Sequence, residues 1–279
     1  AASDVYKRQI LFRGKKVAIA SPRDAIELGI GMVHQHFKLV ECFSVLDNII
    51  LGVEPNKMGF LQKAEARKKV MALSEKYGLR VDPDALVSDI SVGMPQRVEI
   101  LKMLYRDNEI LIFDEPTAVL TPQEIDELME IMRGFKKEGK SILFEAQLGA
   151  LRDLDYGIYP YTTSSNVIGA YAPIGAGIPG HKLNNSVGVM KAYSSCVGDG
   201  PFTTELAMTE EEKHLLREAG HEYGAATGRP RRVGPFDVVA SRYGVQCQGC
   251  DELALTLFDV LDYMEEVPVV AQYKLADGT

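Results

Sequence analysis

Cysteine is scarce and long hydrophobic runs are missing from this sequence, and each absence excludes a class of protein. The 279 residues contain four cysteines at scattered positions. That usage is typical of a reducing compartment and does not suit a disulfide framework. No apolar stretch approaches the roughly 20 residues that a membrane-spanning helix needs, and the N-terminal residues do not have the pattern of a signal peptide. We therefore expect a cytoplasmic protein.

Neither a zinc site nor a nucleic-acid surface is predicted. The sequence CQGC at 247–250 is a single C-x-x-C pair without a second pair or a nearby histidine, which disfavours zinc. Residues 1–144 hold 21 basic and 21 acidic side chains, whereas residues 145–279 hold 10 basic and 18 acidic ones. Neither half is basic, which argues against a nucleic-acid partner.

Alternating helix and strand patterns predict an α/β fold. With 46% hydrophobic and 25% charged residues, the chain is globular and long enough for two modest domains. Caps, helix-stopping glycines and apolar periodicity predict helices over 21–29, 64–78 and 121–139. Strands are predicted over 30–34, 110–113 and 141–144, the last two parallel and adjacent. We expect two truncated α/β lobes with mostly parallel sheets and flanking helices.

Two carboxylates stand where a candidate nucleotide site would need them. Asp114 and Glu115 directly follow the apolar residues ILIF at 110–113. A carboxylate at the end of a buried strand can hold Mg²⁺ on a nucleotide, while its neighbour polarises the attacking water. The alternative is a strand that merely ends in acidic residues, which is common.

Two further segments favour the nucleotide site. VHQHF at 33–37 and ISVGMPQRVEILKMLYR at 90–106, taken with IFDEPT, resemble the ATP-binding subunit of bacterial ABC importers, most closely the sugar and nucleoside class. The resemblance covers residues from about 10 to 144. It implies Mg²⁺ with ATP as cofactor and a membrane permease as partner, with the subunit peripheral at the inner membrane face. The roles implied are Q-loop glutamine for Gln35, metal ligand for Asp114, catalytic base for Glu115, and signature-loop contacts to the partner subunit's ATP for Ser91 and Gly93.

Three departures from that family pattern stand out. Pro95 occupies the position after SVGM where the family usually has glutamine. The strand expected at 141–144 leads into EAQLGALRD, where the family has a switch histidine. A P-loop is expected tens of residues before the Q-loop, yet only nine residues precede ILFRGKK. GAGIPGHK at 175–182 comes near that motif, but His181 replaces its lysine, and we expect an ordinary glycine loop there.

The second half carries motifs of another family. These are YPYTTSSN at 159–166, VGVMKAYSSCVGDGPFTTEL at 187–206, HEYGAATGRPRRVGPFD at 221–237 and LTLFDVLD at 255–262. In order and spacing they resemble adenylosuccinate synthetase, from about residue 144 to residue 279. The resemblance implies GTP-dependent ligation of aspartate to inosine monophosphate (IMP) in purine nucleotide biosynthesis. It also implies Mg²⁺ with GTP as cofactor and a homodimeric enzyme.

The same resemblance implies three groups of binding residues. For IMP these are Gln147, Thr163 and Arg229; for aspartate, Ala225, Ala226, Thr227, Gly228, Arg229 and Arg231; and for GTP, Arg231, Leu257, Phe258 and Asp259. Guanidinium forks suit the carboxylates and phosphates of such ligands, so we expect Thr163, Arg229 and Arg231 to share one cleft. Leu257 stands where family members commonly carry lysine. Leu148 stands where they carry glutamine, and the glutamine of this chain, Gln147, comes one position earlier.

The two resemblances meet at SILFE, residues 141–145, which suits both an ATPase strand and a synthetase strand. DVYKRQ at 4–9 looks like a translated sequencing adaptor, so residues 1–9 are interpreted as an artefactual leader. We expect an ABC ATP-binding fragment over 10–143 and a synthetase fragment over 144–279, joined as a chimera of two truncated genes. The alternative is a true fusion protein. Three functions stay open: a purine-biosynthetic ligase, a transport ATPase subunit, and a non-catalytic nucleotide-binding chain inactive in both reactions.

Overall fold

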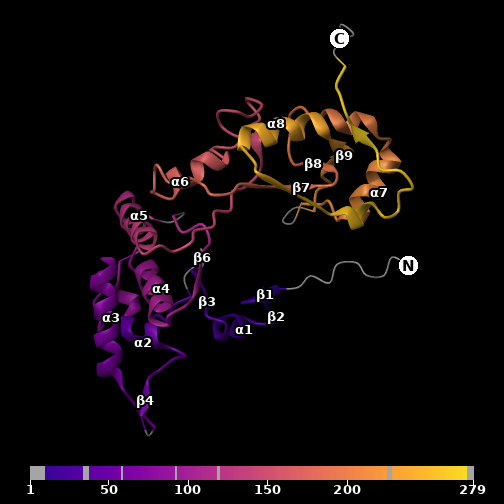
Figure 1. Ribbon diagram of the computed structural model, residues 1–279. Helices are drawn as coiled ribbons and strands as arrows, with labels where there is room; N and C mark the ends of the chain where they lie inside the picture. The colour runs from indigo at the N-terminus through magenta and orange to yellow at the C-terminus, as the bar shows by residue number, and fades with distance from the viewer. Residues whose placement is uncertain are drawn as a thin grey trace. The chain divides into compact units, whose positions relative to one another are not determined.

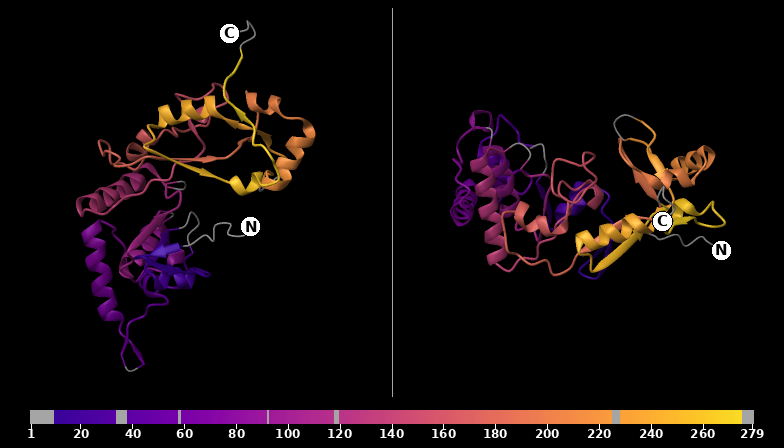
Figure 2. Two further views of the ribbon diagram at one scale, coloured as in Figure 1. Left: turned by 45° about the vertical axis from the view of Figure 1, so that its right-hand side comes forward. Right: turned by 90° about the horizontal axis from the view of Figure 1, so that it is seen from above.

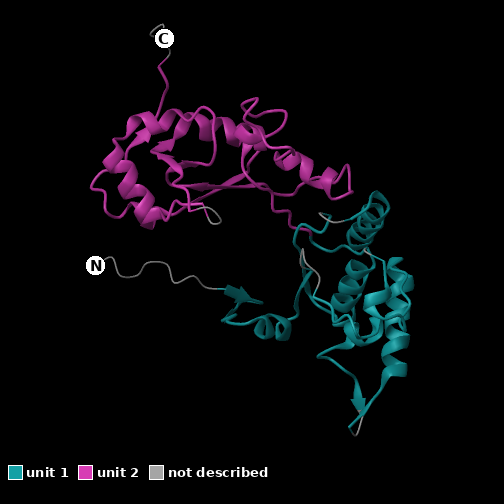
Figure 3. Cartoon of the chain, turned by 180° about the vertical axis from the view of Figure 1, so that it is seen from behind, with its two compact units in different colours: residues 1–141 teal, residues 142–279 magenta. Residues whose placement is uncertain are grey.

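The computed structural model describes residues 10–33, 38–57, 59–91, 93–117, 120–224 and 228–274. The chain divides between Ser141 and Ile142 into unit 1 (residues 1–141) and unit 2 (residues 142–279), drawn in two colours in Figure 3. Each unit has a hydrophobic cluster of its own. No helix within the described ranges is long and apolar enough to cross a membrane.

Unit 1 is built mainly from helices around one short parallel sheet. Its described elements, in chain order, are β1 (Ile10–Phe12), β2 (Lys15–Val17), α1 (Pro22–Glu27), β3 (Ile30–Val33), α2 (Val45–Ile50), β4 (Asn56–Lys57), β5 (Phe60–Leu61), α3 (Lys63–Tyr77), the 3₁₀ turn η1 (Val87–Asp89), α4 (Met94–Tyr105), β6 (Ile110–Phe113) and α5 (Pro122–Lys137).

The caps read from the sequence set the helix boundaries of unit 1. On α1, the Ser21 side chain accepts a hydrogen bond from the Asp24 amide, and Asp24 accepts one from the Ser21 amide. Thr121 and Glu124 form the same capping box on α5, which satisfies amides that would otherwise lack partners at the start of the helix. Gly78 follows α3 with φ of 70°, a backbone conformation that glycine adopts readily. The three predicted helices are confirmed.

Helices α2, α3, α4 and α5 enclose the core of unit 1, and Figures 1 and 2 show them grouped together. The helices present apolar side chains to one another at helical spacing, as packed amphipathic helices do. Fully or almost fully buried examples are Val45, Ile49, Val70, Val98, Leu101, Leu128 and Ile131. Packing between helices therefore supplies most of the buried apolar surface of this unit.

Strand β6 pairs with β3 and not with the segment predicted as its neighbour. The two strands are parallel, with Ile30 opposite Ile110 and Val33 opposite Phe113. The expected strand at 141–144 is absent, so the prediction of a parallel pair between 110–113 and 141–144 is wrong. Residues 141–147 form no helix or strand, and the Leu143 side chain is 96% exposed. An apolar run forms a strand only when its backbone finds a partner, and this run lies at the boundary between the units.

Unit 2 contains shorter elements and longer connections. Its described elements are η2 (Ala150–Arg152), η3 (Gly169–Tyr171), α6 (Ala172–Gly175), β7 (Val187–Lys191), β8 (Ser194–Cys196), η4 (Thr203–Ala207), α7 (Glu210–Gly220), β9 (Arg232–Gly234), β10 (Phe236–Asp237), α8 (Val238–Gln248), β11 (Glu252–Thr256), η5 (Phe258–Leu261) and β12 (Val269–Val270).

Two strand pairs organise unit 2. β7 and β11 pair in parallel along five residues, and β8 pairs with β9 in an antiparallel ladder beside α7 (Figure 1). A small core packs around Tyr193, Leu216, Val233 and Leu261. With the parallel pairs β3–β6 and β10–β12, these elements confirm a mixed α/β fold with parallel sheets and flanking helices.

Removing a buried leucine from unit 1 should cost stability, whereas removing the exposed one at the unit boundary should not. Leu101 is 0% exposed and Leu143 is 96% exposed. We expect Leu101→Ala to lower the free energy of unfolding by about 2–5 kcal/mol, because it leaves a cavity in packed surroundings. Leu143→Ala should change it by less than about 0.5 kcal/mol. Urea unfolding of the full chain, followed by circular dichroism, measures both; a large loss in Leu143→Ala would show that residues 141–144 are buried.

Candidate functional site

Asp114 directly follows β6 at the edge of the sheet where β3 also ends. Its amide donates a hydrogen bond to the Val33 carbonyl over 3.2 Å. The last residue of β3 therefore lies beside the start of the segment that carries Asp114 and Glu115. Gln35, the predicted Q-loop residue, lies outside the described residues. The side chains of Asp114 and Glu115 are exposed, as a metal ligand and a base acting on a bound nucleotide would need to be.

Glu115 has an uncommon backbone conformation for a residue that is not glycine. Its φ is 43°, in the left-handed region. Such conformations cost roughly 1–3 kcal/mol, and they cluster at active sites and ligand clamps. The strained position falls on the residue predicted to be the catalytic base.

The signature segment is held against the start of α5. Ser91 is exposed, and its carbonyl accepts a hydrogen bond from the Met94 amide over 3.0 Å. Gly93 is the buried N-cap of α4, where a Cβ would lie 1.2 Å from Glu124 Oε1, so a larger residue would displace the α5 cap. Pro95 occupies the first turn of α4, where a missing amide hydrogen is tolerated.

Gln96 is a residue that sequence reasoning missed. Its side chain is 4% exposed, and its Nε2 donates to the Pro116 carbonyl over 2.6 Å. This bond ties the signature helix to the loop that follows Asp114 and Glu115. The sequence signal was its place three residues after the signature glycine, on the face of α4 that turns inward.

A formal P-loop match, also overlooked, is rejected by its structural setting. GFKKEGKS at 134–141 fits the spacing G-x-x-x-x-G-K-S. Gly134 lies inside α5, and the amides of Glu138, Gly139 and Lys140 donate back to carbonyls of that helix. A P-loop follows a strand and opens a helix, with its amides free for phosphate. Here the motif ends a helix, where the dipole disfavours anions.

The predicted glycine loop at 175–182 is confirmed as a loop. It follows the short helix α6 and is followed by no helix before β7. The His181 ring packs against Phe144, with ring centroids 6.5 Å apart. The setting is unlike a phosphate loop.

In unit 2, the predicted aspartate-binding loop is the tip of a hairpin. Tyr223 and Pro230 form an antiparallel bridge. The Arg231 amide donates to the Glu222 carbonyl over 2.9 Å, and the Gly224 amide donates to the Arg229 carbonyl over 2.8 Å. Residues 222–224 and 229–231 are therefore the two sides of the stem. Three of the predicted residues, Ala225, Ala226 and Thr227, lie outside the described residues, whereas Gly228 and Arg229 are described and exposed.

A buried carboxylate stands at the base of this hairpin. Glu222 is 2% exposed; its Oε1 accepts from Lys191 and from the Tyr193 hydroxyl (2.6 Å), and its Oε2 accepts from Arg231 (3.2 Å). Burial alone would raise the pKa of Glu222, but the bonds from Lys191 and Tyr193 and the nearby positive charges outweigh it and lower the pKa. The Glu222 carboxylate is therefore ionised at neutral pH, and both of its oxygens accept hydrogen bonds.

The segment around Thr163 is closed into a loop by another buried carboxylate. Asp153 is 0% exposed and accepts hydrogen bonds from the amides of Asp155 (2.9 Å), Tyr156 (3.0 Å), Val167 (2.6 Å) and Ile168 (3.3 Å). Burial raises the pKa of Asp153, and the four amides together lower it further than burial raises it. Thr163 lies within this closed loop, half-buried, and its amide donates to the Arg152 carbonyl over 2.8 Å.

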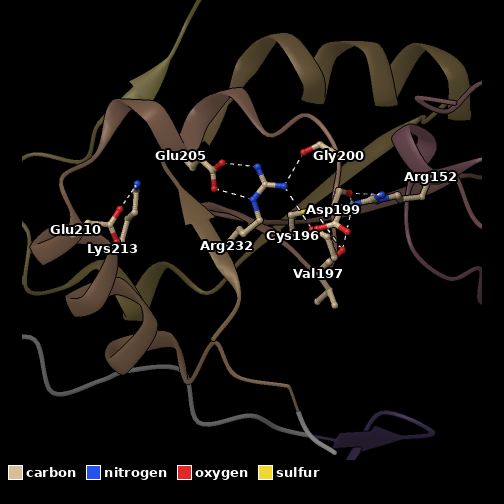
Figure 4. A network of polar contacts seen from close by, with 10 residues as sticks. Arg152, Cys196, Val197, Asp199, Gly200, Glu205, Glu210, Lys213 and Arg232 are labelled. Carbon is tan, nitrogen blue, oxygen red and sulfur yellow. Dashed lines mark hydrogen bonds and ion pairs between the residues drawn. The ribbon is translucent and has the colours of Figure 1, made fainter. Parts of the chain in front are cut away.

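Two guanidinium groups hold the loop at 196–200 from opposite sides, as Figure 4 shows. Arg152 donates to the carbonyls of Tyr161 (2.7 Å) and Val197 (3.2 Å). Arg232 donates to the Gly200 carbonyl over 2.7 Å and forms a bidentate ion pair with Glu205. Contacts thus run from the segment of Thr163 through this loop to the neighbour of Arg231. Whether Thr163, Arg229 and Arg231 share one cleft stays a prediction.

Gly200 allows the close approach within that loop. Its φ is 112°, and a Cβ there would lie 2.7 Å from Cγ of Tyr161. Both the backbone conformation and the contact with the ring require glycine.

The family models match two overlapping parts of the chain. The adenylosuccinate synthetase model matches residues 69–279, and the ABC transporter model matches residues 3–118. The first match covers well over half of the sequence. The chain belongs to the adenylosuccinate synthetase family. The shared residues 69–118 include the later part of α3, all of α4 and β6 of unit 1.

Individual relatives reproduce this division. The adenylosuccinate synthetase of Heliobacterium modesticaldum is 40% identical over 211 residues, which are 72% of this chain and 49% of that protein. The guanosine import ATP-binding protein of Bacillus subtilis is 60% identical over 135 residues, which are 48% of this chain and 26% of that protein. A solved, fully ligated adenylosuccinate synthetase from Plasmodium falciparum is 28% identical, covers 74% of this chain and 49% of that one, and has a TM-score of 0.48.

The matches confirm that the chain joins an ABC ATPase-like region to an adenylosuccinate synthetase-like region, and both families bind nucleotides. The chain spans about half the length of the synthetase relatives and about a quarter of the length of the nucleoside-import relatives. The predicted boundary between residues 143 and 144 stays a prediction.

Leu148 and Leu257, the two positions named above as departures from the expected synthetase pattern, both have a left-handed backbone. Leu148 has φ of 57° and Leu257 has φ of 61°. The Leu148 side chain is 67% exposed, whereas that of Leu257 packs against the core around Tyr193. Leu257 therefore lies against the protein interior. Phe258 and Asp259, which follow it, are exposed.

The remaining predicted residues of the synthetase unit are accessible. Gln147 is exposed and donates to the Ser165 hydroxyl over 3.3 Å, within the same segment as Thr163. The charge of Asp259 reaches Tyr193 and contributes to its raised pKa, after burial and the bond to Glu222. Asp259 and Arg231, both predicted GTP contacts, thus each act electrostatically on Tyr193.

The polar groups of the described residues include no cluster of three histidine, cysteine or acidic side chains placed to hold a metal. Asp114 is a single carboxylate, and Mg²⁺ bound to a nucleotide commonly takes only one or two protein carboxylates, with phosphate and water completing its shell. The exposed Asp114 at the end of β6 fits that requirement.

Asp153 should stabilise the loop around Thr163 in a pH-dependent way. Asp153→Asn removes the charge and turns one acceptor into a donor that faces amides, so we expect a loss of about 1–3 kcal/mol at pH 7. The pKa of Asp153 is lowered in the folded chain. The stabilisation by its ionised carboxylate is therefore complete at pH values above the pKa of an unfolded aspartate, about 3.9. It is lost as the pH falls through the folded pKa.

Urea unfolding at pH 7 and pH 3 measures this difference. The gap between the native chain and Asp153→Asn should be smaller at pH 3 than at pH 7. Asp155→Asn, which alters an exposed carboxylate of the same loop, is the matched control and should have little effect at either pH. A gap that widens at pH 3 would contradict the assignment.

Proposed function

We propose that this chain binds the substrates of adenylosuccinate synthesis through unit 2 and does not turn them over. In this proposal, unit 2 takes GTP, inosine monophosphate and aspartate. Arg229 and the residues at 225–228 contact aspartate, Thr163 and Gln147 contact IMP, and Arg231, Phe258 and Asp259 contact GTP. The family resemblance suggests these ligands, and the built hairpin at 222–231 supports their assignment to unit 2.

The observation that carries the proposal is the hairpin stem with its two arginines. Backbone hydrogen bonds hold Arg229 and Arg231 on one side of the stem, two residues apart. A pair of guanidinium groups on a fixed backbone suits anionic ligands, here the carboxylates of aspartate and the phosphates of the nucleotides. The loop at 196–200 and the segment of Thr163 lie within a continuous network of contacts that ends at Arg232, beside Arg231.

Mg²⁺ would accompany the nucleotide, and when bound it would neutralise phosphate charge. A second candidate function is ATP binding by unit 1, favoured by the shared end of β3 and β6 at Asp114 and by the bond from Gln96 to Pro116. We place the protein in the cytoplasm. The protein partner expected from the families is a second copy for unit 2, or a membrane permease for unit 1.

Nucleotide binding by unit 2 should depend on Arg231. We expect Arg231→Ala to weaken GTP binding about tenfold or more, because it removes charge-assisted hydrogen bonds. Arg242→Ala, at an exposed arginine on α8, is the matched control and should bind as the native chain does. Titration calorimetry with GTP, IMP and aspartate, and separately with ATP, measures these affinities. Binding of ATP alone, unaffected by Arg231→Ala, would favour unit 1 as the functional part.

The 279-residue polypeptide should catalyse neither reaction. Both sequences that approach a P-loop, at 134–141 and 175–182, lack its strand–loop–helix setting. Phosphoryl transfer relies on positioned donors, and the loss of a single one typically costs about 10²–10³ in rate. Assays of ATP hydrolysis and of GTP-dependent adenylosuccinate formation test this. Turnover within about tenfold of an intact family member assayed alongside would contradict the proposal.

A further inference from the structure

Glu222 is a buried charge that the predicted binding residues leave without a role. It directly follows α7, one residue after His221, the left-handed C-cap of that helix. Its carboxylate is reached by Lys191 at the end of β7 and by Tyr193 just beyond. The third group that reaches it is Arg231, so side chains from two other segments of the chain meet at this one carboxylate.

Glu222 and Arg231 are joined twice. The Arg231 amide donates to the Glu222 carbonyl over 2.9 Å, and Nη1 of Arg231 donates to Oε2 of Glu222 over 3.2 Å. The backbone bond fixes where Arg231 leaves the stem, and the side-chain bond fixes the direction of its guanidinium. Nε of Arg231 is buried without a hydrogen-bond partner among the described residues. Among the described residues, this guanidinium is thus oriented from one side only, through Glu222.

The charges at this point favour an additional anion. One carboxylate faces two cations, and about a third of the Lys191 and Arg231 side chains is exposed (31% and 32%), against 2% for Glu222. The negative charge is buried, whereas both positive groups reach the surface. Lys191 is further restrained by the Ser195 hydroxyl at 2.8 Å. The Arg231 side chain has no such second restraint among the described residues.

We propose that Glu222 is a positioning residue that aims Arg231 at the phosphate-bearing ligand of unit 2. This rests on the proposed function, since it deepens the role given there to Arg231. The alternative is that Glu222 only holds α7 to β7 through Lys191 and Tyr193. The two roles differ in one respect: a positioning role requires the effect of Glu222 on binding to act through Arg231.

A double-mutant cycle separates the two roles. Four full-length chains are compared: native, Glu222→Gln, Arg231→Ala and the double variant. GTP affinity is measured by calorimetry. We expect Glu222→Gln to weaken GTP binding about tenfold, as loss of a charge-assisted hydrogen bond does, and to have no further effect when Arg231 is already alanine. Equal effects of Glu222→Gln in both backgrounds would overturn the proposal.

Hydrogen exchange without ligand gives a second readout. The amides of Gly228, Arg229 and residue 231 should exchange faster in Glu222→Gln and in Arg231→Ala, with the double variant no faster than the faster single one. Glu218→Gln is the matched control, because exposed Glu218 contacts Tyr223 of the same stem but no cation. Its exchange should resemble that of the native chain. Native exchange at 228–231 in Glu222→Gln would overturn the proposal.

The two proposals can fail separately. If the native chain binds neither GTP, IMP nor aspartate, the proposed function fails, while the exchange cycle still decides whether Glu222 holds Arg231. If Glu222→Gln does not fold, Glu222→Asp replaces it, since it keeps the charge but is too short to meet Lys191 and Arg231 together. Glu222→Asp should then weaken GTP binding and speed exchange in the same way but to a smaller extent, and only while Arg231 is present. The absence of these effects would overturn the inference.

Discussion

Unit 2 depends on satisfying its buried carboxylates, of which Asp153 and Glu222 are the least exposed. A buried charge is costly unless hydrogen bonds and opposite charges surround it, and the two sites meet that requirement differently. Asp153 uses four backbone amides, so its loop closes around a single side chain. Glu222 uses two cations and a hydroxyl drawn from separate segments. One carboxylate therefore shapes the segment of Thr163, and the other shapes the stem that carries Arg231.

Strands in both units keep apolar side chains exposed. Parallel sheets are normally covered on both faces, yet Ile110 and Ile112 of β6 are 41% and 43% exposed, and Val189 of β7 is 73% exposed. On β11, Leu253 points to the face opposite Val189, because neighbouring residues of parallel strands alternate between faces. It is 54% exposed. Both faces of the pair β7–β11 thus carry exposed apolar side chains. Packing between helices and loops therefore stabilises most of each unit.

The short motifs acquire meaning only from their setting. GFKKEGKS satisfies the spacing of a phosphate loop but caps the end of α5, where its amides are already bonded to helix carbonyls. The signature segment around Gly93 differs, because tertiary contacts constrain its residues. Its glycine is required by the close approach of Glu124, and Gln96 joins it to the loop after β6. The same residue types serve as a helix stop in one place and as a contact between functional loops in the other.

The sequence alone determined the helix limits of unit 1, the strand ends at Asp114 and the two family relationships, because caps, glycines and motif spacing are local signals. Thr121 with Glu124, and Gly78, needed no knowledge of the fold. Tertiary structure decided what local pattern could not. The apolar residues at 141–144 remain without a strand partner, Leu257 turns to the core, and Glu222, Asp153 and Gln96 gain their roles from partners distant in the chain. Burial and pairing are properties of the folded chain, so no local pattern could reveal them.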